Sequence, residues 1–237
     1  MKKFLLPALA IILSSFTTSA ATIPVVFHVL YNNANQNVSD SIVYDQLRVL
    51  NQDFNRLNAD TINTPAPFLA VAASANIDFC LAQQDPLGNA STGIIRKQVS
   101  VPSFSTISNI VSSATGGDDM WPRDYYLNIY IVSLANGMLG LSSLPGASAN
   151  GDGVIIHYTI VGGPTFPGSQ IGYNRGRTLV SLVAHWFNLR SMAGSLGCAD
   201  EDSVSDTPIS DGSLFGGCLT FPHVTVFKFS SMLNQRQ

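Results

Sequence analysis

Hydrophobic residues fall into short, dense runs separated by polar loops, a pattern typical of a chain with a buried β-sheet. The run 23–31 is rich in β-branched and aromatic residues and predicts a buried strand. Further runs predict strands at 75–82, 93–101, 126–132 and 153–158. Segments rich in Gly, Ser and Pro predict loops at 136–150 and 162–172.

Two longer helices are predicted from apolar positions at helical spacing. One runs from about Asp40 to Leu57, with Ser39 as its N-cap and Ile42, Leu47, Leu50 and Phe54 on one face. The other runs from Thr178 to Leu189, after Gly176. Because helices and strands alternate, we expect an α/β (α+β) fold with a mixed, twisted sheet and the second helix packed against it.

The N-terminus has the organisation of a secretory signal peptide. Lys2 and Lys3 precede an apolar run at 4–16, and small residues follow at 17–21. We therefore expect a signal peptide at 1–21 and a single domain at 22–237, secreted to the extracellular space or the periplasm. The apolar run is too short for a membrane span, which needs ~20 residues.

Composition narrows the set of partners. Charged residues make up 11% of the chain and the net charge is −3, against ~25% charged residues in typical domains. Lys and Arg are scattered, which argues against nucleic acid or an anionic membrane surface as a partner. No later segment is long and apolar enough to predict a membrane span.

The chain has three cysteines, Cys80, Cys198 and Cys218. Export permits disulfides, but an odd count leaves at least one thiol unpaired. Cys198 and Cys218 flank a loop rich in turn residues and could pair with each other. Cys80 lies in an apolar run, where we expect it to be a small buried residue.

The segment 181–191 has the spacing of a zinc-protease helix without most of its chemistry. Such a helix carries His-Glu-x-x-His and a third His six residues later. Here His185 supplies the middle histidine, Ser181 and Ser191 occupy the other two ligand positions, and Leu182 occupies the general-base position. Asn188, three residues after His185, is one of the few residues able to turn the chain with positive φ.

The chain resembles the pappalysin-type metzincins, a family of secreted zinc metalloproteases. The resemblance rests on the order and spacing of segments that include 23–29, 50–55, 79–82, 85–89, 126–130, 139–146, 176–178, 185–190, 202–208 and 217–218. It implies a metzincin-like sheet with a packed active-site helix. It also implies a zinc cofactor, hydrolysis of peptide bonds and a protein or peptide substrate.

The same resemblance identifies what has changed. In the family the positions of Ser181 and Ser191 are zinc histidines, and that of Leu182 is the general-base glutamate. Ala184 replaces a glycine, and Met232 has no Met-turn sequence around it. We therefore expect the C-terminal subdomain, from about residue 190, to be incomplete.

The acidic loop after the helix is a candidate calcium site. The resemblance favours calcium there, with Asp202 and Thr207 as ligands and Asp206 adjacent, because calcium prefers carboxylate and carbonyl oxygens. A solvated acidic turn is an equal alternative. The family pairing would replace the partner of Cys198 with Val226, so the family's disulfides are not expected to be intact.

The sequence therefore predicts a secreted metalloprotease-family protein that is catalytically impaired or inactive. Glu201 is the only glutamate in the chain and lies outside the motif helix, so no other Glu can serve as base without rearrangement. Three alternatives remain: an active zinc endopeptidase with unusual ligands, a module that binds peptide without turnover, and a non-functional truncated product. A Ser181–His185 dyad is conceivable one turn apart, but coincidence is the simpler explanation.

Overall fold

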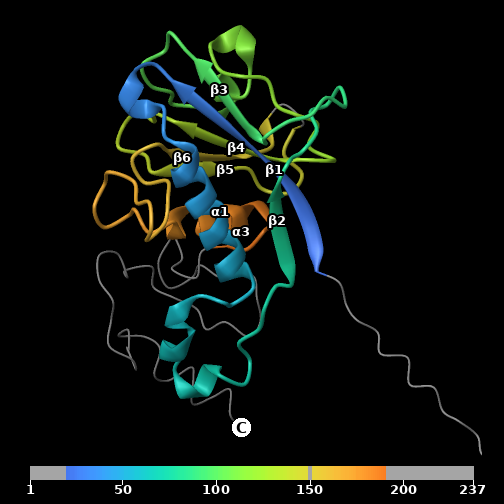
Figure 1. Ribbon diagram of the computed structural model, residues 1–237, viewed down its shortest axis with the longest axis vertical. Helices are drawn as coiled ribbons and strands as arrows, with labels where there is room; N and C mark the ends of the chain where they lie inside the picture. Colours follow the sequence, from blue (N-terminus) through green and yellow to red (C-terminus); the bar gives the residue numbers. More distant parts are fainter. Residues whose placement is uncertain (1–19, 149–150, 191–237) are drawn as a thin grey trace, which may run out of the picture.

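The structure is a computed structural model that describes residues 20–148 and 151–190. Within them lies one six-stranded sheet, in the order β2-β1-β4-β6-β5 with β3 also paired to β1 (Figure 1). The strands are β1 Ala21–Tyr31, β2 Ile77–Leu81, β3 Ile94–Gln98, β4 Leu127–Val132, β5 Gly140–Ser142 and β6 Val154–His157. The α-helices are α1 Asp40–Phe54, α2 Ile107–Ile110 and α3 Arg177–Trp186, and the 3-10 helices are η1 Ala34–Gln36, η2 Ala59–Asn63, η3 Ala66–Phe68 and η4 Ser113–Thr115.

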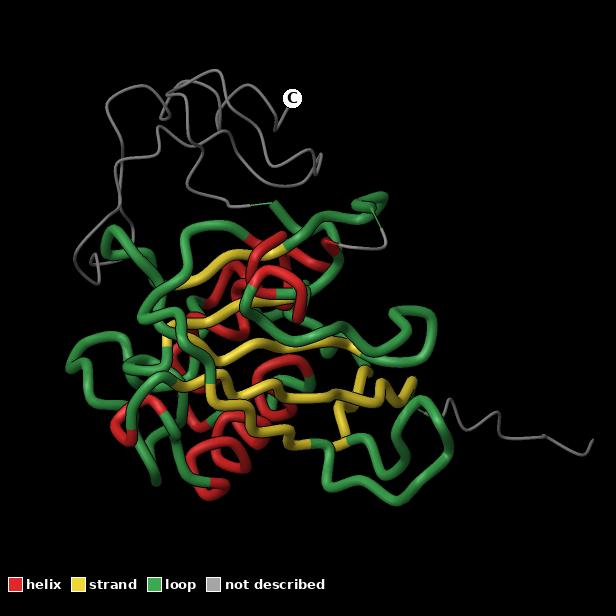
Figure 2. Tube along the Cα trace, turned by 90° about the horizontal axis from the view of Figure 1, so that it is seen from above, coloured by secondary structure: helices red, strands yellow, loops and turns green. Residues whose placement is uncertain are grey.

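The sheet is mixed, as the alternation of helices and strands predicts. β1 pairs in parallel with β2 through its first half and with β3 through its second half, while β4 lies on its other side. β6 continues the parallel sheet, and β5 pairs antiparallel to β6 at the edge. This arrangement confirms the expected α/β class with a mixed, twisted sheet and packed helices (Figure 2).

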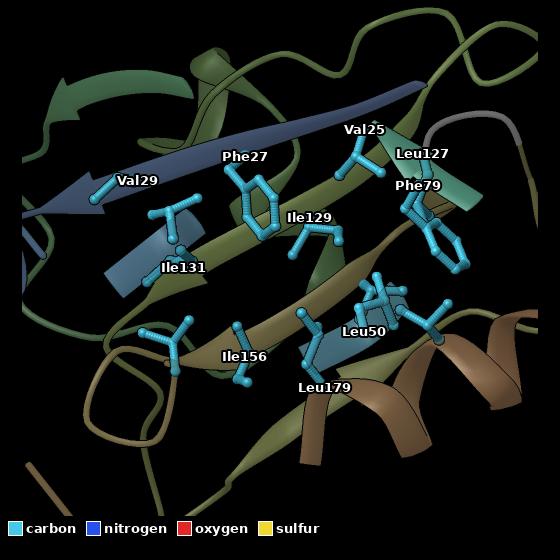
Figure 3. Packing of buried hydrophobic residues seen from close by; sticks show 14 of the residues in the cluster. Val25, Phe27, Val29, Leu50, Phe79, Leu127, Ile129, Ile131, Ile156 and Leu179 are labelled. Carbon is cyan, nitrogen blue, oxygen red and sulfur yellow. The ribbon is translucent and has the colours of Figure 1, made fainter. Parts of the chain in front are cut away.

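Two hydrophobic clusters cover the two faces of the sheet. Phe27 and Ile129 point toward α1 and α3, where they join Leu50 and Leu179 in one cluster (Figure 3). The intervening strand residues, such as Leu30 and Tyr130, face the other way and pack with Ile110 of α2. The alternation along β1 and β4 therefore serves two buried layers, because successive side chains point to opposite faces.

All six residues of β4 are buried, including Asn128 and Tyr130. A central parallel strand is covered on both faces, so its sequence need not alternate between apolar and polar residues. The buried polar side chains of β4 must therefore find partners inside the protein.

Both long helices end earlier than their sequence pattern predicts. α1 stops at Phe54, and Arg56 follows with a φ of 53°. The amide of Leu57 then donates to the carbonyl of Gln52 at 2.7 Å, the bond that closes a Schellman turn. Within the described residues, no helix has the length and apolar character needed to cross a membrane.

The expectation that Cys80 is buried is wrong. Cys80 is a free, exposed cysteine on β2, whereas its neighbour Phe79 is buried. β2 ends the sheet, so alternate residues of this strand face solvent. The sequence run around Cys80 is apolar on both sides, which hid this alternation.

Candidate functional site

The start of α3 is fixed by the side chain of Gln46 on α1. Gln46 Nε2 donates to the carbonyl of Gly176 at 3.0 Å, and Gln46 Oε1 accepts from the amide of Gly162 at 3.1 Å. Gln46 is fully buried, so both of its polar ends are satisfied by backbone. Gly176, with a φ of 82°, turns the chain into the helix, a conformation that favours glycine.

Arg177 opens α3 and is held by two carboxylates. Its Nε lies 2.9 Å from Asp53 Oδ2, and its Nη2 lies 3.0 Å from Asp60 Oδ1. A cation in the first turn interacts unfavourably with the helix dipole. The two carboxylates offset that unfavourable interaction. The hydrogen bond from Arg177 lowers the pKa of Asp60. Burial raises the pKa of Asp53, whose Oδ1 has no hydrogen-bond partner among the described residues.

Asn188 ends α3 with a φ of 72°, as its position in the motif predicts. The amide of Asn188 donates to the carbonyl of His185 at 2.8 Å, and that of Leu189 donates to the carbonyl of Ala184 at 2.9 Å. These two bonds form a Schellman motif with Asn188 as the left-handed residue. Asn188 therefore ends the helix in the left-handed turn that the motif predicts.

The structure places Ser181 and His185 one turn apart on α3. Ser181 is exposed and His185 is partly buried. His185 Nδ1 lies 2.6 Å from the carbonyl oxygen of Leu189, so this nitrogen carries a proton and donates it. The other ring nitrogen, Nε2, is therefore the one left for an external partner. No hydrogen bond links Ser181 to His185 within the described part of the chain, so the structure gives no support to a dyad.

Leu182 is the residue that the sequence places at the general-base position of the motif. It is partly buried and packs between α3 and the edge strand β5, against the hydrophobic cluster that contains Leu179. A Cβ built on Gly140 of β5 would collide with Leu182 Cδ1 and would lie 2.7 Å from the carbonyl oxygen of Ile155. Gly140 thus allows Leu182 to sit directly on the strand.

A second contact ties the motif helix to the segment that follows β5. Trp186 Nε1 donates to Asp152 Oδ1 at 2.6 Å, and Ser143 Oγ donates to the same oxygen at 2.8 Å. The amide of Gly153 donates to Ser143 Oγ at 3.0 Å. The sequence does not predict β5, because the segment 136–150 has the composition of a loop. Nor does it single out Asp152, which lies between that loop and the strand predicted at 153–158.

The described residues do not fit a catalytic zinc ion. Such an ion needs three protein ligands, and α3 supplies one imidazole, from His185. Within residues 20–148 and 151–190, no three His, Cys, Asp or Glu side chains are grouped to hold a metal. The other residues predicted for metal or disulfide sites lie outside the described residues: Ser191, Cys198, Asp202, Asp206, Thr207 and Cys218.

Curated proteins similar to the chain are named extracellular metalloproteases. An extracellular metalloprotease of Arthroderma benhamiae is 25% identical over 198 residues, which are 82% of this chain and 61% of that protein. An extracellular metalloprotease of Verticillium alfalfae is 32% identical over 216 residues, 85% of this chain and 62% of that protein. The chain thus spans about three fifths of the length of these relatives. No protein-family model matches it.

Solved structures give a closer match. Mature mirolysin of Tannerella forsythia, in complex with a cleaved peptide, is 40% identical, with a TM-score of 0.83 over 89% of this chain and 79% of that chain. A mutant of promirolysin from the same organism matches at the same identity and TM-score, over 69% of its own chain. The protein belongs to the metalloprotease family that contains mirolysin and these extracellular metalloproteases.

Proposed function

We propose that this protein is a secreted, pappalysin-type metzincin that has lost zinc-dependent peptide hydrolysis. One observation carries the proposal: the motif face of α3 presents Ser181, Leu182 and His185, with Leu182 packed against Gly140 of the edge strand. Secretion is supported by the relatives, which are named extracellular, and by the signal-peptide pattern at 1–21.

The chemical argument has two independent parts. Loss of a general base typically costs about 10²–10⁴-fold in rate, and Leu182 has no group that can accept a proton. Loss of the metal removes the source of hydroxide at neutral pH, and a serine hydroxyl such as that of Ser181 is a poor neutral ligand. Either loss alone leaves little activity.

Peptide binding without turnover is a second candidate function. β5 lies at the edge of the sheet, where an extended peptide can add as a further strand. Mirolysin, a relative of known structure, has been solved with a cleaved peptide. Contacts from Leu182 and Trp186 hold β5 and the segment after it against α3, so the edge strand is fixed in place.

The decisive experiment measures the zinc content of the purified protein beside a protease assay on an unfolded protein substrate. We expect substoichiometric zinc and no cleavage above background. The alternative of an active endopeptidase with unusual ligands requires stoichiometric zinc and cleavage that both chelator and His185→Ala abolish. Binding of unstructured peptides without cleavage would favour the binding module.

Restoring the motif tests whether the loss is confined to three side chains. We expect the triple change Ser181→His, Leu182→Glu, Ser191→His to give far less activity than an intact family member. The reason is that the new glutamate would replace a leucine packed on Gly140. Strong proteolysis by the triple variant would contradict this expectation.

Calcium and disulfide proposals concern residues outside the described part of the chain. We propose Asp202, Asp206 and Thr207 as a calcium loop, because carboxylate and carbonyl oxygens suit calcium, and Cys198–Cys218 as a possible pair. A calcium site predicts a rise in Tm on adding millimolar calcium that EDTA reverses. Identical melting curves with calcium and with EDTA would leave the acidic residues as a solvated turn.

A further inference from the structure

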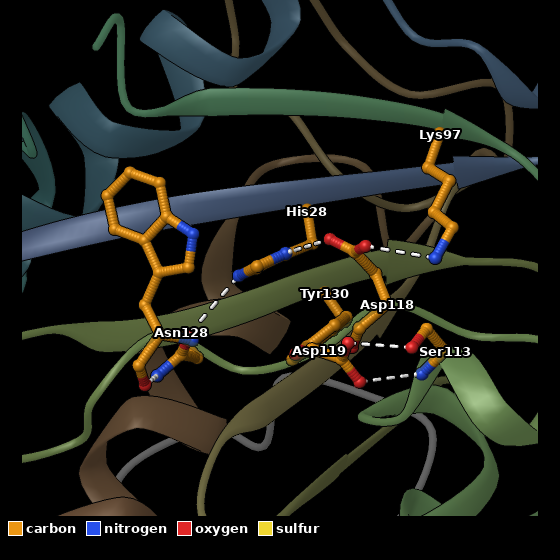
Figure 4. A network of polar contacts seen from close by, with 8 residues as sticks. His28, Lys97, Ser113, Asp118, Asp119, Asn128 and Tyr130 are labelled. Carbon is orange, nitrogen blue, oxygen red and sulfur yellow. Dashed lines mark hydrogen bonds and ion pairs between the residues drawn. The ribbon is translucent and has the colours of Figure 1, made fainter. Parts of the chain in front are cut away.

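A buried polar cluster lies on the face of the sheet opposite α3. It is built around His28 of β1, which is 0% exposed, and it joins β3, β4 and the segment 118–121 (Figure 4). The His28 ring stacks on Tyr130, with centroids 4.3 Å apart. None of these groups belongs to the motif helix, so the cluster is independent of the proposed function.

Both ring nitrogens of His28 face oxygen atoms. Nδ1 lies 2.8 Å from Asp118 Oδ2, and Nε2 lies 3.2 Å from Asn128 Oδ1. An ionised carboxylate only accepts hydrogen bonds, so Nδ1 carries a proton. The protonation of Nε2 depends on which end of the Asn128 amide faces it, because the oxygen and nitrogen of an amide are assigned from their partners.

The partners of Asn128 fix its amide. Asn128 Nδ2 donates to the carbonyl of Trp121 at 2.9 Å, and the amide of Trp121 donates to Asn128 Oδ1 at 2.9 Å. If the Asn128 amide were flipped, its NH2 group would face the N–H of Trp121, and its oxygen would face the carbonyl oxygen of Trp121. Asn128 is 1% exposed, so solvent could not relieve that conflict. The atom facing His28 Nε2 is therefore an acceptor, and Nε2 also carries a proton.

One carboxylate lies between the two basic side chains of the cluster. Asp118 accepts from His28 on one oxygen and from Lys97 Nζ, 3.1 Å away, on the other. Asp119 is exposed and accepts from the amide and the hydroxyl of Ser113, so it does not belong to the buried charges. Tyr130 adds a phenol whose hydroxyl donates to the carbonyl of Asp118 at 3.0 Å. The carboxylate of Asp118 is therefore placed to stabilise a cation at His28 Nδ1.

The ionisation of the neighbours agrees with this arrangement. Burial by itself would raise the pKa of Asp118, but the hydrogen bond and charge of His28, with those of Lys97, outweigh it and lower that pKa below its ordinary value. Burial and the charges of Asp118 and Asp119 raise the pKa of Tyr130. The phenol is therefore neutral, and its ring face is available to a cation.

We propose that His28 is a buried imidazolium that fastens the segment 118–121 to β1 and β4. Its two ring N–H groups face acceptor oxygens on Asp118 and Asn128. A neutral ring would leave a bare nitrogen against an acceptor oxygen and would remove the cation beside Asp118.

Nitrogen chemical shifts test the protonation state directly. Long-range ¹H–¹⁵N correlation of the labelled protein separates imidazolium from both neutral tautomers, and through-bond connection to the backbone assigns the His28 signals without any variant. We expect both His28 nitrogens to have protonated shifts at pH 7. An unprotonated shift at either nitrogen at that pH would refute the proposal.

Thermal melts test the contribution of His28 to stability. At pH 7 we expect His28→Gln to lower the Tm by roughly 2–4 °C, the shift that a modest loss of stability produces in a protein of this size. His157→Gln is the matched control, since His157 Nδ1 has a local partner, Thr159 Oγ1 at 2.7 Å, and we expect a smaller shift. An unchanged Tm in His28→Gln would overturn the proposal.

Discussion

His28 and His185 lie on opposite faces of the same sheet and have opposite relations to the fold. Both ring nitrogens of His28 have partners from β4 and the segment 118–121, whereas His185 has one internal bond, to a carbonyl four residues along. Loss of the His185 side chain would therefore remove one hydrogen bond, to an exposed part of the backbone. A buried network cannot lose a member without leaving a neighbour unsatisfied.

The strongest test of this contrast is Asp118→Asn. The change removes the carboxylate shared by His28 and Lys97, and we expect a loss of roughly 2–3 kcal/mol, less than for a fully buried pair because the Asp118 side chain is 19% exposed. Urea unfolding measures it. His185→Ala, on the other face, should cost much less.

The pH dependence of the same variant sharpens the result. The folded pKa of Asp118 is lowered, so its contribution is present above about pH 4, the ordinary value for aspartate, and is lost as pH falls further. We expect the wild type to lose this stability in acid and Asp118→Asn to lose none of it. Equal acid sensitivity of the two proteins would argue against a shared carboxylate.

Gly140→Ala tests how closely Leu182 packs on the edge strand. The added methyl group meets Leu182 and the carbonyl of Ile155, and we expect a cost of about 1–3 kcal/mol. Leu182→Ala should reduce that cost without abolishing it, because the contact with Ile155 remains. Gly151→Ala is the control, since its Cβ would make a single contact of 3.4 Å, with Ser148. Equal costs at Gly140 and Gly151 would mean that Leu182 does not press on β5.

The smallest predicted effect concerns the turn after α3. Asn188→Gly should stabilise the protein by roughly 0.5–1 kcal/mol, because glycine adopts positive φ at lower cost than asparagine. Asn188→Ala should destabilise it by a similar amount. If both changes lower the Tm, the asparagine side chain contributes more than its backbone conformation.

The sequence predicts most of the sheet because its strands are dense in β-branched and aromatic residues, and the structure confirms β1, β2, β3, β4 and β6 close to the expected ranges. It fails at β5, three residues of glycine, leucine and serine whose strand character comes from pairing with β6. The composition of these three residues does not indicate that pairing.

The site divides in the same way. The helix, its turn at Asn188 and the substitutions in the motif follow from spacing along one segment. The contacts of Trp186 with Asp152, and of His28 with Asp118 and Asn128, join residues far apart in the chain. Such contacts depend on the register of strands, which a single sequence does not encode in its periodicity.

Gln46 bonds the backbone at both ends of the loop 162–176, and this has a consequence for how the protein can vary. The Gln46 side chain holds both ends of this loop, so the number of residues between them does not determine where α3 begins. Insertions and deletions within the loop should therefore be tolerated, whereas a substitution at Gln46 would alter the position of the whole helix.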